Sequence, residues 1–201
     1  MEETNNTKSQ ILKESLKLFA EKSYHGASVR EIAKAVNKRE SAIYNHFSSK
    51  EEILKEIVNE FSSRNFGTII LTDDLINNLS KPQKFFSMLS KNILEFWNLE
   101  NERMFIKILL NLNSIKLEKS LYTIDAYLDD FRKLCTFIFT EMMNHNFLKK
   151  MNVELLSNEF VSPLFLIELK LISLENNNYK YAKELELHSE FIWESSKRSV
   201  F

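Results

Sequence analysis

The sequence predicts an all-α protein with a small N-terminal helix-turn-helix head followed by a larger helical bundle. The 201 residues include only two Gly and two Pro. Average proteins contain roughly 7% Gly and 5% Pro, so few turns and strand breaks are available here. Apolar residues recur three and four positions apart, the spacing of amphipathic helices. With 44% hydrophobic residues, the chain is expected to fold around a core and not to remain disordered.

The first two helices can be predicted from an apolar face and a capping signal. The first helix is expected over about residues 7–22, with a face that packs on the next two helices and comprises Ile11, Leu12, Leu16 and Phe19. Gly26 is expected in the connecting turn. Ser28 followed by Glu31 matches a capping box, so a second helix should begin at Val29.

The helix that begins at Val29 is expected to be the first half of a helix-turn-helix motif at residues 28–47. Its apolar face consists of Val29, Ile32, Ala33 and Val36. Asn37 falls where this helix must stop, and Asn tolerates a left-handed backbone. A helix of about two turns should follow, anchored inward by Ile43 and Phe47, four residues apart. In such a motif the second helix enters the major groove of DNA.

A fourth helix should complete the head. Ser49-x-x-Glu52 reads as a second capping box, which predicts a helix over about residues 50–66. Its apolar face is formed by Ile53, Leu54, Ile57, Val58 and Phe61. The stretch 67–80 is the expected joint between a DNA-binding domain of residues 1–66 and a second domain of residues 67–201.

The second domain is expected to be a helical bundle. One helix should start at Ser80-Lys81-Pro82-Gln83, because Pro is tolerated in the first turn. Further helices are predicted at about 101–117, 121–146, 153–175 and 179–198. Pro163 lies inside an otherwise helical apolar run and should kink or divide it.

The distribution of charge favours DNA binding more than the formal net charge of −1 does. From Lys22 to Lys50 there are six basic and two acidic residues, a local excess of four positive charges. A solvated helix surface is the alternative interpretation of this excess. Its coincidence with the predicted motif favours DNA.

A specific combination of residues surrounds the motif. It comprises Phe19, Gly26, Ile32-Ala33 and Tyr44-Asn45-His46-Phe47-x-x-Lys50-Glu51-x-x-Leu54. This combination resembles the TetR family of bacterial transcriptional regulators, over about residues 7–61. Two residues depart from the family pattern: Asn37 replaces the usual Gly of the turn, and Lys38 replaces a small apolar residue. The resemblance implies a cytoplasmic homodimer that binds a double-stranded DNA operator, as a repressor relieved by a small effector.

By the same resemblance, one set of residues faces base edges or nearby phosphates: Arg39, Glu40, Ser41, Ala42, Asn45 and His46. A second set positions the head on phosphates: Ser28, Arg30, Lys38, Tyr44 and Lys50. Asn favours adenine, and the methyl group of Ala42 can contact a thymine methyl. Alternatively these are ordinary exposed residues, Tyr44 is a core tyrosine that bridges the head's helices, and the ring of His46 packs against the first helix.

The resemblance also implies an effector cavity and a dimer interface in the second domain. Aromatic residues expected near the cavity are Trp97, Phe105, Tyr127 and Phe131. Formal charges are sparse along the faces that carry them, so a hydrophobic or aromatic effector is expected. The helices at about 153–175 and 179–198 have more apolar surface than one small bundle needs, which favours a homodimer through these helices.

No pattern indicates an enzyme, a cofactor or a metal site. Four scattered His residues show no H-E-x-x-H spacing, and no glycine-rich phosphate loop or nucleophile elbow is present. His188 is expected to be buried with a satisfied ring, and Cys135 to be a small core residue, with redox sensing as the alternative. No stretch reaches the roughly 18 apolar residues of a membrane span, so a soluble protein is expected. The rival interpretation of the whole chain is a helical protein–protein adaptor without DNA-binding activity.

Overall fold

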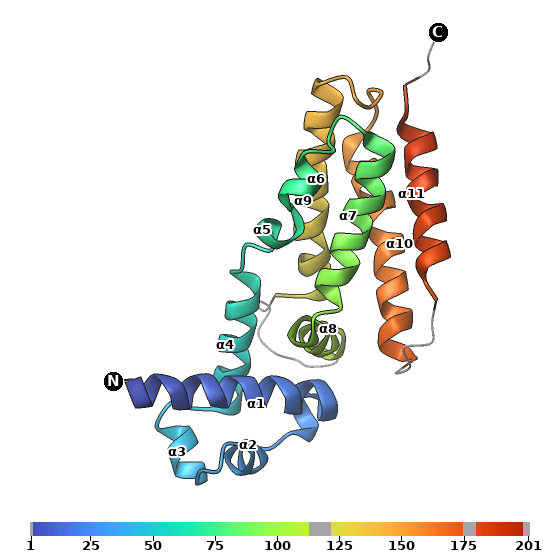
Figure 1. Cartoon of the computed structure of the whole chain (residues 1–201). Coiled ribbons are helices and arrows are strands. Elements are labelled where there is room, and N and C mark those ends of the chain that lie inside the picture. The colour runs from blue at the N-terminus through green and yellow to red at the C-terminus, as the bar shows by residue number, and fades with distance from the viewer. Residues whose placement is uncertain (1, 113–121, 175–179, 199–201) are drawn as a thin grey trace. The chain divides into compact units, whose positions relative to one another are not determined.

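The computed structural model describes residues 2–112, 122–174 and 180–198, and every regular element among them is a helix (Figure 1). The predicted all-α class is therefore confirmed. The helices are α1 (Glu2–Gly26), α2 (Val29–Ala35), α3 (Glu40–Tyr44), α4 (Lys50–Ser62), α5 (Gly67–Ile70), α6 (Asp73–Ile76), α7 (Pro82–Trp97), α8 (Glu100–Leu112), α9 (Ile124–Asn144), α10 (Val153–Ser173) and α11 (Ala182–Ser196). The parts of the predicted helices that fall on 113–117, 121, 175 and 179 lie outside the described residues.

Contacts divide the chain into two compact units. The head unit consists of Met1–Arg64 with Glu100–Ile124, and the bundle unit consists of Asn65–Leu99 with Asp125–Phe201. Helix α8 belongs to the head unit because it packs along α1. A boundary between two separately folding domains after residue 66 stays a prediction.

Helix α1 is longer than expected and contains a kink. It extends to Gly26, but Ser23 inside it has φ 63° and ψ 165°, a backbone conformation that is essentially restricted to glycine. Gly26 itself does not have a positive φ. The positive φ of this turn is therefore at Ser23, three residues before the Gly26 that was expected in the turn.

Relief of this strain should stabilise the protein. A residue held in such a conformation costs of order 1–3 kcal/mol, whereas Gly loses up to about 1 kcal/mol more through backbone entropy on folding. We expect Ser23→Gly to raise the free energy of unfolding by about 1 kcal/mol, or Tm by roughly 2–4 °C. Thermal denaturation followed by circular dichroism measures this change.

Gly26→Ala is the matched control for that prediction. A Cβ at Gly26 would lie 3.5 Å from Lys22 Cβ and 3.7 Å from Ser23 Oγ, both ordinary contacts. Gly26→Ala should therefore not lower Tm, and the smaller entropy of the unfolded chain should raise it slightly. A Ser23→Gly protein less stable than the wild type would contradict the argument from strain.

The predicted joint at residues 67–80 is occupied by two short helices of the bundle unit. Helices α5 and α6 pack against α7, and Asn92 Nδ2 donates a hydrogen bond of 2.8 Å to Ile70 O. Ile70 and Leu75 are fully buried. These apolar side chains anchor the stretch to α7, and its role as a joint between two domains stays a prediction.

The remaining helices of the bundle unit agree with the prediction, with one correction. Helix α7 begins at Pro82 as expected, and α10 is continuous from Val153 to Ser173 with Pro163 inside it. The prediction that Pro163 could divide the helix was wrong. The missing N–H removes one helical hydrogen bond, but buried neighbours such as Phe160 and Leu164 hold both sides of the proline in the core.

Aromatic rings make up a large part of the core of the bundle unit. Phe86, Phe139 and Phe160 form a cluster with ring centroids 5.3–5.8 Å apart. His188 Nε2 lies 3.0 Å from Phe160 O, and burial lowers the pKa of His188. Cys135 is fully buried, which raises the pKa of its thiol well above its ordinary value. Cys135 thus has the core environment predicted for it, whereas His188 has the predicted partner for its ring but is only half-buried.

No helix among the described residues is long and apolar enough to cross a membrane.

Candidate nucleic-acid interface

The helix-turn-helix motif forms as predicted, with one difference in length. Helix α2 begins at Val29 with its complete capping box, and Asn37 has φ 53°, the left-handed conformation that the turn requires. Ile43 and Phe47 are 1% and 2% exposed, so they anchor the second half of the motif inward. Helix α3 has five residues, which is less than the predicted two turns, although Asn45 keeps helical φ and ψ as its C-cap and the N–H of Phe47 still donates to Ile43 O.

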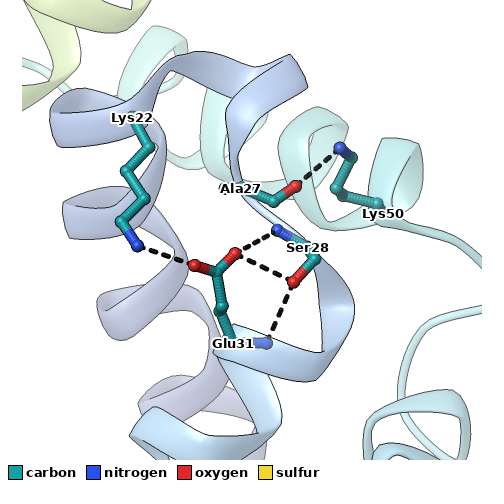
Figure 2. Close-up of polar contacts among 5 residues, drawn as sticks. All are labelled: Lys22, Ala27, Ser28, Glu31 and Lys50. Carbon is teal, nitrogen blue, oxygen red and sulfur yellow. Dashed lines mark hydrogen bonds and ion pairs between the residues drawn. The ribbon is translucent and has the colours of Figure 1, made fainter.

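Polar contacts tie the start of α2 to the end of α1 (Figure 2). The carboxylate of Glu31 accepts hydrogen bonds from the backbone N–H of Ser28 at 2.9 Å and from its hydroxyl at 2.8 Å. Lys22 Nζ lies 2.6 Å from the other oxygen of Glu31. These bonds and the cation of Lys22 lower the pKa of Glu31 to about 2. A phosphate at Ser28 would have to compete with this carboxylate.

The depressed pKa predicts acid sensitivity at this cap. Because folding lowers the pKa of Glu31 from its ordinary 4.5, the stabilisation is complete above about pH 4.5 and is lost as the pH falls towards about 2. Glu31→Gln keeps a capping-box side chain but removes the charge. We expect the Tm difference between wild type and Glu31→Gln to be constant above pH 5 and to shrink towards pH 2. A difference that stays constant over the whole range would contradict the assignment.

Lys50 has partners within the protein. Its Nζ donates hydrogen bonds to Tyr24 O at 2.7 Å and Ala27 O at 2.8 Å, and it lies 4.4 Å from the centre of the Tyr24 ring. Burial lowers the pKa of Lys50. The side chain predicted to contact a phosphate is therefore bound to the turn before α2.

The second predicted capping box is only half formed. The backbone N–H of Glu52 donates to Ser49 Oγ at 3.1 Å, as predicted. The carboxylate of Glu52, however, accepts hydrogen bonds from the N–H and the hydroxyl of Ser48 and does not bond to the N–H of Ser49. Ser48 offers two donors one residue earlier, which explains the difference.

The other candidate residues form an accessible surface on the motif. Arg30, Lys38, Arg39, Glu40, Ser41 and Asn45 are exposed, and Ala42 and His46 are half-buried. Tyr44 is 52% exposed, so it is not the core tyrosine of the alternative interpretation. These positions leave the polar groups of the candidate set free to meet a ligand.

The cations of the motif differ in their pairing from four other lysines of the head unit. Lys8, Lys17, Lys22 and Lys55 each form an ion pair with a carboxylate, at 2.6–3.1 Å. Among the ion pairs of the described residues, none includes Arg30, Lys34, Lys38 or Arg39. Four cations of the helix-turn-helix are thus available to phosphates, while Lys13, Lys50 and Lys107 are the lysines without such a pair among the other described residues of the head unit.

The structure brings together three of the four residues predicted for the effector cavity. The ring of Phe131 lies 5.0 Å from that of Trp97 and 5.1 Å from that of Tyr127, and all three side chains are buried. Trp97 Nε1 has no hydrogen-bond acceptor among the described residues. Phe105 belongs to the head unit, where its ring stacks on Phe61 at 4.3 Å.

An ion pair of the head unit was missed from the sequence. Arg64 Nη2 lies 2.7 Å from Glu102 Oε2, and Glu102 is only 2% exposed. The guanidinium also lies over the ring of Phe61, at 3.7 Å from its centre. A signal was present, because Glu102 lies one turn before the buried Phe105 and Ile106 on the apolar face of α8.

Comparisons with known proteins agree with the geometry of the head. The family of bacterial regulatory proteins called the tetR family matches residues 11–57. The chain is 40% identical over 60 residues to the HTH-type transcriptional regulator YuxN of Bacillus subtilis, covering 30% of this chain and 21% of YuxN. It is 34% identical over 64 residues to the HTH-type transcriptional repressor AcnR of Corynebacterium efficiens, covering 32% of this chain and 34% of AcnR. The chain thus matches about a fifth to a third of these relatives, which are described as regulators, in agreement with the prediction that it is not an enzyme.

A solved structure extends the likeness of the fold to most of the chain. The TetR-family transcriptional regulator PfmR of Thermus thermophilus superimposes with a TM-score of 0.61 at 24% identity. The match covers 90% of this chain and 96% of PfmR. The predicted arrangement, a helix-turn-helix head followed by a helical bundle, is therefore found in a solved protein.

Proposed function

Because residues 11–57 of this chain belong to the tetR family of bacterial regulatory proteins, we propose that the protein is a sequence-specific DNA-binding transcriptional regulator. It acts in the cytoplasm as a homodimeric repressor that binds a palindromic operator and is relieved by a small hydrophobic or aromatic effector. The observation that carries this proposal is the set of unpaired cations on the exposed helix-turn-helix.

Operator recognition is assigned to α3 and its flanking residues. Arg39, Ser41 and Asn45 offer groups that hydrogen-bond base edges, and Lys38 and Tyr44 offer groups that bind phosphates. One head of this size reads few bases, so two heads should bind half-sites about one helical turn apart, roughly 34–36 Å, or a multiple of that distance.

Selection of genomic fragments by the purified protein tests this function. Retained fragments should share a palindrome, and their affinity should fall steeply as the salt concentration rises. A protein–protein adaptor of the same fold would show no salt-dependent binding to DNA fragments. Failure to enrich any sequence would contradict the proposal.

The effector site is proposed at the aromatic cluster of Trp97, Tyr127 and Phe131. These rings are in contact, so a ligand must separate them on binding, and the unsatisfied Trp97 N–H offers it a hydrogen-bond donor. If a ligand weakens operator binding, the operator must weaken binding of that ligand by the same factor.

A fluorescence screen tests this proposed effector site. Ligands that change Trp97 emission should lower operator affinity roughly 5–150-fold, the range of typical allosteric coupling. Phe131→Ala is unsuitable, because truncation of a fully buried Phe costs about 3–5 kcal/mol of stability. Phe131→Leu should blunt the response and leave operator affinity unchanged. If every ligand that changes emission leaves operator binding unaltered, the cluster is not the effector site.

A further inference from the structure

We propose that Glu40 is a specificity-determining residue of the operator-binding surface, whose carboxylate accepts a hydrogen bond from the amino group of a cytosine in the major groove. Each half-site of the operator then contains a C·G pair at the position that Glu40 reads. This inference rests on the proposed function, since it names a base that the head selects.

Glu40 brings an exposed carboxylate to the surface that carries the unpaired cations. Of the two acidic residues between Lys22 and Lys50, Glu31 is bonded to Lys22 and Ser28. Glu40 is exposed, and among the ion pairs of the described residues none includes it. Its negative charge is therefore not held by another part of the protein.

The place of Glu40 in the motif directs this carboxylate to base edges. Glu40 is the first residue of α3, and in a helix-turn-helix the N-terminal residues of the second helix contact base edges. Ile43 and Phe47 are 1% and 2% exposed, so the inner side of this segment is fixed against the head. Beside a phosphate the carboxylate would only be repelled, whereas in the groove it can meet a hydrogen-bond donor.

A carboxylate matches cytosine better than the other three bases. An ionised carboxylate only accepts hydrogen bonds. In the major groove guanine and thymine present acceptors, adenine presents a donor beside an acceptor, and cytosine presents only the donor of its N4 amino group. Glu40 therefore disfavours guanine and thymine and selects cytosine.

Substitution of N4-methylcytosine tests this contact at a single hydrogen bond. In a paired duplex one N4 hydrogen bonds to guanine, and the methyl group replaces the other, which faces the major groove. Each cytosine of a retained operator duplex is replaced in turn, and affinity is measured by titration of the labelled duplex. At one cytosine per half-site, methylation should weaken wild-type binding roughly tenfold, which is within the range for a mismatched base pair. Glu40→Ala should bind the methylated and unmethylated duplexes equally.

Glu40→Gln should change the preferred base. The amide of Gln keeps an acceptor and adds a donor, a pattern that matches adenine N6 and N7. Selection of genomic fragments with Glu40→Gln should therefore return half-sites with A·T in place of C·G at that position. A side chain that only stabilised α3 would leave the selected sequence unchanged.

A role of Glu40 confined to the start of α3 gives a different pattern. Negative charge in the first turn stabilises a helix. In that case Glu40→Ala would lower Tm and weaken binding to all duplexes, and methylation would weaken its binding as much as that of the wild type. Equal sensitivity of wild type and Glu40→Ala to every methylated cytosine therefore overturns the inference.

Glu60→Ala is the matched control for the change in charge. Glu60 is an exposed acid near the end of α4 in the same head unit, and it forms no ion pair among the described residues. Glu60→Ala should lose affinity on methylation as the wild type does. A wild-type protein that retains no DNA overturns the proposed function. A wild-type protein that retains a palindrome but is insensitive to methylation at every cytosine overturns only the role of Glu40.

Discussion

Replacement of Lys38 and Arg39 together by Ala is expected to weaken operator binding strongly and to reduce its salt dependence. Both side chains are exposed and form no ion pair among the described residues, so their charge is available to phosphates. Each neutralised phosphate contributes about 0.9 to the slope of log K against log salt. A dimer that loses four contacts should show a slope smaller by about 3–4 and, at 0.15 M salt, an affinity lower by roughly a thousandfold.

The measurement is a titration of a labelled operator duplex at four or more salt concentrations. Lys17→Ala with Lys55→Ala is the matched control, because it removes two positive charges from the same head where carboxylates already neutralise them. Its slope should equal that of the wild type. Equal slopes for Lys38→Ala/Arg39→Ala and wild type would mean that the motif's cations do not contact the DNA backbone.

Signals that act over three or four residues could be predicted from the sequence. Ser28 and Glu31 form their box, and Asn37 adopts the left-handed turn, because both ends of each interaction are encoded within one turn of helix. Ser49 and Glu52 show the limit of this reasoning. The neighbouring Ser48 competes for the same carboxylate, and the spacing alone does not decide between them.

Partners that lie far apart in the sequence could not be predicted in the same way. The charge of Lys50 suggested a phosphate, but its acceptors are two carbonyls whose exposure depends on where α1 ends. The kink of α1 at Ser23 was not predicted, because no sequence pattern marks this serine for a positive φ. The burial of Glu102 beside Arg64 depends on how α8 packs within the head unit.

Burial also changes the choice of residue that tests dimer formation. From the sequence, Ile192 belongs to the apolar surface expected between two copies of the chain. In the structure Ile192 is 0% exposed within one chain, so Ile192→Asp would place a carboxylate in an apolar core at a cost of several kcal/mol. That variant should unfold, and its loss of DNA binding would say nothing about the dimer.

Phe191→Asp is expected to separate the proposed homodimer and leave each chain folded. Phe191 is 63% exposed on α11, one turn beyond Leu187 at 51%, while α10 contributes the exposed Leu155 and Leu166. An interface with two-fold symmetry contains every substituted residue twice, so two new carboxylates would enter one apolar surface. Sedimentation should show monomers with unchanged helicity and Tm. Operator affinity should fall by about 10²–10⁴, because the second half-site is no longer linked to the first.

Ile69→Asp is the matched control, since Ile69 is also an exposed apolar residue, at 54%, but lies on α5. It should remain dimeric and bind the operator as the wild type does. A wild-type monomer at micromolar concentration would contradict the homodimer, and a dimeric Phe191→Asp protein would exclude α11 from its interface. Phe191 is exposed, whereas Ile192 is buried in the interior. If Phe191→Asp loses operator affinity and keeps its Tm, the loss therefore reports on the link between the two heads and not on the fold.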